Sequence, residues 1–129
     1  MYRYRDNSGC TRLSIDRAAK HLAKIGRIVR IEGKRWRGKY GIDEAVLTTG
    51  SLGTIRLSGF LWGYGGEGPR GLTTFLVYVG LPAELAKQAA NSPRLEDLGV
   101  DWTLTHGVVA DHWSLARNRR AYRLAGCRP

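Results

Sequence analysis

A glycine-rich segment at residues 59–72 separates two kinds of apolar pattern along the chain. Before it, Arg27–Glu32 and Thr54–Trp62 alternate apolar and polar residues, a period typical of strands. After it, the apolar residues from Leu72 to Val79 follow the i, i+3, i+4, i+7 spacing of a helix. This change of period predicts an α+β fold in which an N-terminal helix and a small antiparallel sheet are followed by a helical C-terminal half.

Caps, prolines and turn residues set the expected bounds of the elements. Helices are predicted where a capping residue or a proline precedes an apolar face: from Ser14 or Asp16 to about Ile25, after Pro69, over Ala83–Ala90 and from Thr105 onward. Strands are predicted at Tyr2–Arg5, Arg27–Glu32, Arg35–Tyr40, Ala45–Thr49, Thr54–Trp62 with a bulge at Gly59, and Trp102–Leu104. A turn at Gly33-Lys34 would join the second and third strands. No linker or repeat divides the chain, so we expect one domain over residues 1–129.

Positive charge is concentrated towards the two ends of the sequence. The chain has 21 Lys and Arg against 11 Asp and Glu, a net charge of +10. Residues 1–39 hold 12 of these cations and residues 112–129 hold 5, whereas residues 40–111 are acidic overall. Such an asymmetry predicts an anionic partner, although a basic surface can also serve solubility alone.

Two basic segments are the predicted binding surface, for nucleic acid or for an acidic partner. The first is the predicted hairpin, with Arg27, Arg30, Lys34, Arg35, Trp36, Arg37 and Lys39, and the second holds Arg117, Arg119, Arg120 and Arg123. Alternation would place Arg35, Arg37 and Lys39 on one face, suited to phosphates, and Trp36 and Tyr40 on the other. The aromatic rings either stack on bases or belong to the core, with the charges then forming a solvated face.

The segment at 59–72 reads Gly-Phe-Leu-Trp-Gly-Tyr-Gly-Gly-Glu-Gly-Pro-Arg-Gly-Leu. It resembles the GFxWGYGGxGPxxLA core of a family of uncharacterised bacterial, plasmid and phage domains. The resemblance, over about residues 55–113, implies a fold and a place among accessory genes of mobile elements, but no activity.

The same glycines have two physical interpretations. Gly65, Gly66, Gly68 and Arg70 are a candidate anion-binding loop, since backbone N–H groups and a helix N-terminus can hold an anion. We favour a structural role, in which Gly65 and Gly66 adopt positive φ and Trp62 is buried behind them.

No residue pattern indicates catalysis or a metal. His21, His106 and His112 with Cys10 and Cys127 lack ligand spacing, and the cysteines are interpreted as free thiols, although a bridge between them is conceivable. We therefore expect no cofactor and no metal.

The sequence thus predicts a small basic non-enzymatic accessory protein of mobile-element type that binds nucleic acid or a nucleoprotein complex. An anti-defence inhibitor of the anti-CRISPR kind fits this description. The alternatives are a direct DNA- or RNA-binding regulator and, less favoured, a small nuclease or transferase. Without a signal peptide or a membrane span in the sequence, the expected location is the cytoplasm of a bacterial host.

Overall fold

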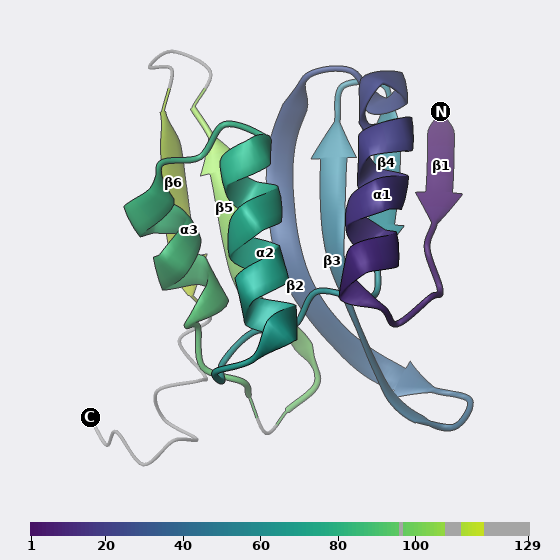
Figure 1. The fold of residues 1–129 in the computed structure, drawn as a ribbon, viewed down its shortest axis with the longest axis vertical. Coiled ribbons are helices and arrows are strands. Elements are labelled where there is room, and N and C mark those ends of the chain that lie inside the picture. Colours follow the sequence, from purple (N-terminus) through teal and green to yellow (C-terminus); the bar gives the residue numbers. More distant parts are fainter. Residues whose placement is uncertain (96, 108–111, 118–129) are drawn as a thin grey trace.

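A computed structural model of the protein describes residues 1–95, 97–107 and 112–117. Its centre is a six-stranded sheet with the order β1-β4-β3-β2-β5-β6 (Figure 1). The strands are β1 (Tyr2–Arg5), β2 (Ile28–Gly38), β3 (Gly41–Gly50), β4 (Gly53–Leu57), β5 (Gly99–His106) and β6 (Trp113–Arg117). The sheet is mixed, because β1 runs parallel to β4 while all other neighbours are antiparallel.

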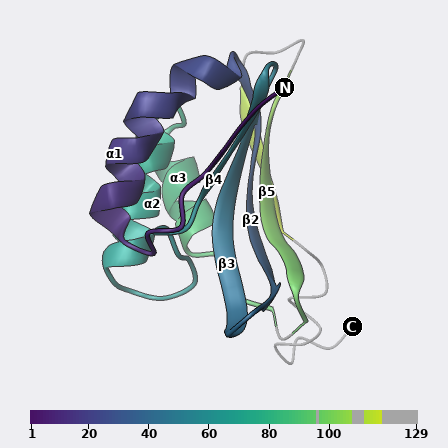
Figure 2. The same ribbon diagram turned by 90° about the vertical axis from the view of Figure 1, so that its right-hand side faces the viewer.

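The helices lie on one face of this sheet. They are α1 (Thr11–His21), which continues into the 3-10 helix η1 (Leu22–Ile25), α2 (Glu67–Tyr78) and α3 (Ala83–Ala90). The view along the sheet edge shows α1, α2 and α3 on the same side (Figure 2). No helix within the described ranges covers the opposite face of the sheet.

The core fills the space between the helices and the covered face of the sheet. Alternate strand residues such as Ile31, Ile55 and Leu104 are fully buried there, as period-two patterning requires. Two tryptophans complete it, with the rings of Trp62 and Trp102 perpendicular and their centroids 5.8 Å apart, a favourable edge-to-face arrangement.

The hairpin of β2 and β3 is longer than its neighbours. β2 pairs with β3 as far as Gly38 and Gly41, but β4 pairs with β3 only from Val46 onward, and β5 begins beside Arg35. Residues 36–45 therefore form a two-stranded ribbon that projects beyond the helices (Figure 1). We call this segment the projecting ribbon.

The predicted turn at Gly33-Lys34 is wrong, because β2 is continuous and the chain turns at Lys39-Tyr40. A Cβ built on Gly33 would lie 2.3 Å from Nε1 of Trp102. Glycine is thus needed at 33 so that the tryptophan ring can lie against the β2 backbone. The sequence prediction interpreted Gly33 as a turn residue, whereas its role is to allow the Trp102 ring to lie close to the strand backbone.

The predicted fold class is also wrong. The sheet has six strands and mixed direction, and the expected helical C-terminal half instead contains β5 and β6. Thr105 lies within β5 rather than capping a helix, and Trp113 and Ala116 lie in β6. Apolar and polar residues alternate around Trp102 and Leu104, a period of two that is typical of a strand. This segment is β5, which pairs with β2.

Other predicted elements agree with the structure. α3 has the predicted bounds, β1 is an edge strand, and the helix around Pro69 is α2. The first helix begins at Thr11, earlier than the expected Ser14 or Asp16. β4 ends at Leu57, so Gly59 lies in a loop and not in a strand bulge.

Candidate nucleic-acid interface

Successive residues of each strand point to opposite faces of the sheet, which determines the side chains on the face opposite the helices. Ile31 and Ile55 are fully buried beneath the helices, so their neighbours Arg30 and Arg56 point to the opposite side. Lys34, four positions after Arg30 in β2, shares that side and is exposed.

Strand β1 adds two more arginines to the same side. Tyr4 is paired with Ile55 and its ring is stacked on His21 of α1, with centroids 3.7 Å apart. Tyr4 therefore faces the helices, and Arg3 and Arg5, both exposed, face the open side.

We call this surface the open basic face. Its cations come from three strands and are Arg3 and Arg5 of β1, Arg56 of β4, and Arg30 and Lys34 of β2. Trp36 of β2 lies on the same side at the start of the projecting ribbon, and Glu32 and Asp43 are the carboxylates that the same alternation places there. The face therefore carries an excess of positive charge.

One arginine of this face lies over its tryptophan. The guanidinium carbon of Arg56 is 4.9 Å from the ring centroid of Trp36, within the range of a cation–π contact. A hollow of about 360 Å³ opens beside them, with Asn7, Ala45 and Ser58 on its walls. Asp43 and Glu44 also line this hollow, so it offers an aromatic surface rather than an excess of positive charge.

The charges of the face repel one another. Burial is the main cause that lowers the pKa of Arg56 from its usual value, and the positive charge of Arg5 lowers it further, while Asp43 acts in the opposite direction. A bound anion would relieve this repulsion between Arg5 and Arg56.

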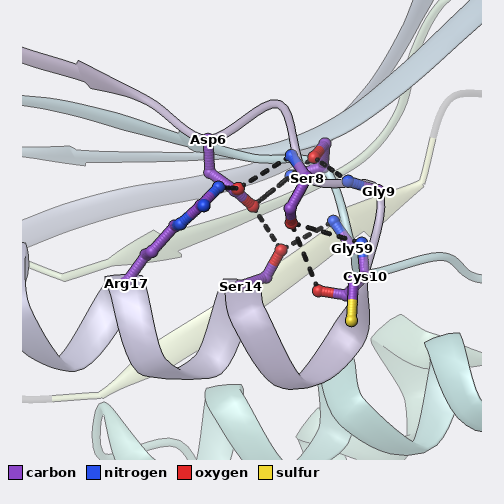
Figure 3. Close-up of polar contacts among 8 residues, drawn as sticks. Asp6, Ser8, Gly9, Cys10, Ser14, Arg17 and Gly59 are labelled. Atoms are coloured by element: carbon purple, nitrogen blue, oxygen red, sulfur yellow. Dashed lines mark hydrogen bonds and ion pairs between the residues drawn. The ribbon is translucent and has the colours of Figure 1, made fainter.

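Asp6, next to Arg5 in sequence, does not neutralise the face because it points inward. Figure 3 shows its carboxylate held beneath β1. It accepts hydrogen bonds from the Ser14 hydroxyl, from the Ser8 backbone N–H at 2.9 Å, and from Arg17 Nη1 at 2.6 Å. The Ser14 hydroxyl oxygen also accepts the Gly59 N–H at 2.8 Å. This network ties the β1–α1 connection to the loop after β4.

Arg35 is a predicted interface residue that the structure turns into the protein. Only 6% of it is exposed, and its Nε donates to Asp101 Oδ2 at 3.0 Å. The same carboxylate oxygen accepts the indole N–H of Trp62 at 2.7 Å, and the Arg35 guanidinium also donates to the carbonyl of Leu95. Arg35 is therefore structural, and Trp36, not Arg35, faces the open side.

The remaining predicted cations are dispersed. Arg37 and Lys39 lie on the projecting ribbon, where Lys39 Nζ is 5.4 Å from the ring centroid of Tyr40. Tyr40 is 92% exposed, so it does not belong to the core. Arg27 lies beside His106 at the other end of β2, with Nη2 3.5 Å from Nδ1.

The predicted C-terminal arginines divide between described and undescribed residues. Arg117 lies in β6 and donates to the carbonyl of Gln88 at 2.6 Å and to Ser92 Oγ at 3.2 Å, which places it on the helix side. Arg119, Arg120 and Arg123 lie outside the described residues.

Sequence reasoning missed three cations of the open basic face. The alternating Tyr-Arg-Tyr-Arg of β1 could have identified Arg3 and Arg5, because two aromatics on one side of a strand put the arginines on the other. Arg56, between the apolar residues Ile55 and Leu57, carries the same signal.

The glycine-rich loop shows a different use of its glycines from the one predicted. Trp62 is fully buried, as expected. Positive φ occurs at Gly63 (85°), whereas Gly65 is not among the positive-φ glycines and Gly66 has an extended φ of 161°. The prediction of positive φ at Gly65 and Gly66 is therefore wrong.

The candidate anion-binding role of this loop remains a prediction. Gly65, Gly66 and Arg70 border a hollow of about 180 Å³ that Lys87 also lines. Gly68 faces Leu61 instead, where a Cβ would lie 3.0 Å from the leucine Cβ.

The structure was also searched for metal-ligand groups and membrane-spanning helices, and the chain was compared with known proteins. Among residues 1–95, 97–107 and 112–117, no three His, Cys, Asp or Glu side chains are grouped as metal ligands, and no helix is long and apolar enough to cross a membrane. No protein-family model, curated protein or solved structure matches the chain significantly. The family resemblance of residues 59–72 therefore remains a prediction.

Proposed function

We propose that this protein binds single-stranded nucleic acid on the open basic face. The observation that carries the proposal is the shared placement of Arg3, Arg5, Arg30, Lys34 and Arg56 on the sheet face that the described helices leave uncovered, with Trp36 at the ribbon end of that face. The acidic side chains of Asp6 and Asp101 are meanwhile buried in internal ion pairs. The positive charge is thereby left available to phosphates.

The shape of this surface favours a single strand over a duplex. A duplex groove admits one helix or a two-stranded ribbon, not a broad sheet. A single strand can spread across a sheet, with its phosphates on arginines and its bases stacked on aromatic rings. Trp36 offers such a ring where the open basic face meets the projecting ribbon, and the exposed Tyr40 offers another at the ribbon tip.

The proposal retains a non-enzymatic accessory role in the bacterial cytoplasm. Phosphate contacts carry no base information, so binding through these cations should depend little on sequence. An anti-defence role would use the same face on a guide or target strand within a nucleoprotein complex.

Fluorescence anisotropy with a labelled 12-nucleotide RNA and its DNA counterpart tests the proposal. The test variant is R5Q/R30Q/K34Q, and the matched control is R12Q/K20Q/K24Q, which also removes three positive charges but from exposed positions on the helix side. For a single strand the logarithm of affinity falls with that of salt by about 0.7 per phosphate contacted. The test variant should therefore lower the magnitude of the slope by about 2, and the control should leave it unchanged.

Two results would contradict the proposal. Equal losses in the two variants would mean that binding follows net charge and not the open basic face. If the wild-type protein does not bind either strand at physiological salt, free single-stranded nucleic acid is not its partner, and an assembled nucleoprotein complex would be the remaining candidate.

A further inference from the structure

A large groove lies on the helix-bearing side of the sheet, away from the open basic face. Its volume is about 870 Å³, and it lies between η1 and the C-terminal end of α2. The floor comes from the start of β2 and from the adjoining ends of β5 and β6. Its lining includes Leu22, Arg27, Ile28, Tyr78, Val79 and Trp113.

Aromatic rings stand on two sides of this groove. Tyr78, in the last turn of α2, is 67% exposed, although it belongs to an amphipathic helix whose other face is buried. Trp113 is half-buried in β6, and its ring lies 5.0 Å from that of His106. Leu22, Ile28 and Val79 add apolar surface between these rings. The lining can therefore hold a flat apolar group.

The polar part of the lining is positive. Arg27 Nη2 lies 3.5 Å from His106 Nδ1, and a guanidinium has five N–H donors, so this contact leaves donors for a ligand. None of the described lining residues is an aspartate or a glutamate. An anionic group in the groove would therefore meet a cation without a competing carboxylate in the described lining.

We propose that this groove binds a small planar aromatic molecule that carries one acidic group. The ring lies against Tyr78 and Trp113, and the acid accepts hydrogen bonds from Arg27 at the His106 end. A volume of about 870 Å³ lies within the usual range of roughly 300–1,000 Å³ for small-molecule sites. Nucleoside monophosphates and aromatic carboxylates share this chemistry.

The aromatic sulfonate 8-anilinonaphthalene-1-sulfonate is a suitable probe, since its fluorescence rises in apolar surroundings. The neutral N-phenyl-1-naphthylamine has the same rings without the acid and reports ring binding alone. The wild-type protein should bind one sulfonate probe per chain. The R27Q variant should weaken sulfonate binding about tenfold and leave the neutral probe unchanged, while Y78A should weaken both.

Matched variants separate this groove from other sites. R12Q removes an exposed arginine of α1 outside the groove, and R30Q removes one from the open basic face, so both should bind the sulfonate probe as the wild type does. Displacement by adenosine monophosphate or by indole-3-acetate then distinguishes a nucleotide from an aromatic carboxylate as the natural class. Far-UV circular dichroism confirms that Y78A and R27Q remain folded.

Three results would overturn the proposal: equal effects of R27Q and R12Q, unchanged binding in folded Y78A, or several weak probe sites on the wild-type chain. Because R30Q is part of the nucleic-acid test and R27Q is not, failure of this proposal is distinguishable from failure of the proposed function.

Discussion

The guanidinium of Arg56 lies 4.9 Å from the ring centroid of Trp36, although the two residues belong to strands on either side of β3. The contact holds a cation over an aromatic ring on the face that the helices leave open. Arg5 contributes to a lowered pKa of Arg56, after burial, so positive charges are crowded there. An anionic partner on the open basic face would offset that repulsion.

Arg35 and Arg37 are neighbours in β2 with opposite expected roles. R35Q should lower the free energy of unfolding by about 3–5 kcal/mol, because it leaves the carboxylate of Asp101 buried without its cation. R37Q, on the exposed ribbon, should change it by less than about 0.5 kcal/mol. Urea unfolding of both variants measures the difference. Similar stabilities would show that the buried ion pair does not hold β2 to β5.

Gly63 and Gly65 offer a second matched pair, in the glycine-rich loop. G63A should cost about 1–2 kcal/mol, because Gly63 has a φ of 85° and a Cβ there would lie 2.8 Å from Arg94 Cγ. A Cβ on Gly65 meets no atom within 4 Å, so G65A should leave thermal stability nearly unchanged. A lower melting temperature for G65A than for G63A would contradict this account of the loop.

Stability should depend on pH through Asp6. Burial alone would raise the pKa of this carboxyl, but hydrogen bonds from Ser14 and Ser8 and the contact with Arg17 lower it from 3.8 to about 2. Because the pKa of Asp6 is lower in the folded protein than in the unfolded chain, its ionised carboxylate stabilises the fold at pH values above the unfolded pKa. This contribution to the free energy of unfolding should be about 2 kcal/mol above pH 5 and should be lost as the pH falls towards 2.

Chemical unfolding at several pH values, with two asparagine variants, checks the assignment to Asp6. D6N should be less stable at pH 7 and should flatten the dependence between pH 5 and 2. D16N replaces an exposed carboxylate of α1 and should keep the wild-type dependence. A wild-type slope that survives in D6N would assign the effect to other carboxyl groups.

The sequence could predict elements with a strong local signal. The bounds of α3 follow from its apolar face and from the Asn91-Ser92-Pro93 break. The fold class could not be obtained in this way, because β5 depends on pairing with β2, about 70 residues earlier in the chain, and β6 depends on pairing with β5. Short apolar runs in this part of the sequence are compatible with both a helix and a strand, and only pairing with a partner strand decides between them.

The candidate site was predictable only in part. The basic character of β2 was evident, and Arg30, Lys34 and Trp36 do share the open basic face. Arg35 was misassigned because its partner Asp101 lies 66 residues away, and no local pattern shows such a pairing. Local alternation could have indicated that Arg3, Arg5 and Arg56 point away from the core, but not that the β1–β4 pairing brings them onto one face.

The indole N–H signals of the four tryptophans test the central claim most directly. Trp36 lies on the open basic face, Trp62 and Trp102 are fully buried on the covered side, and Trp113 lines the groove. In a ¹⁵N-labelled protein titrated with the 12-nucleotide RNA, the Trp36 signal, assigned with W36F, should shift while the signals of Trp62, Trp102 and Trp113 stay in place. A bound RNA that leaves the Trp36 signal unchanged, or that shifts Trp113 instead, would contradict binding on the open basic face.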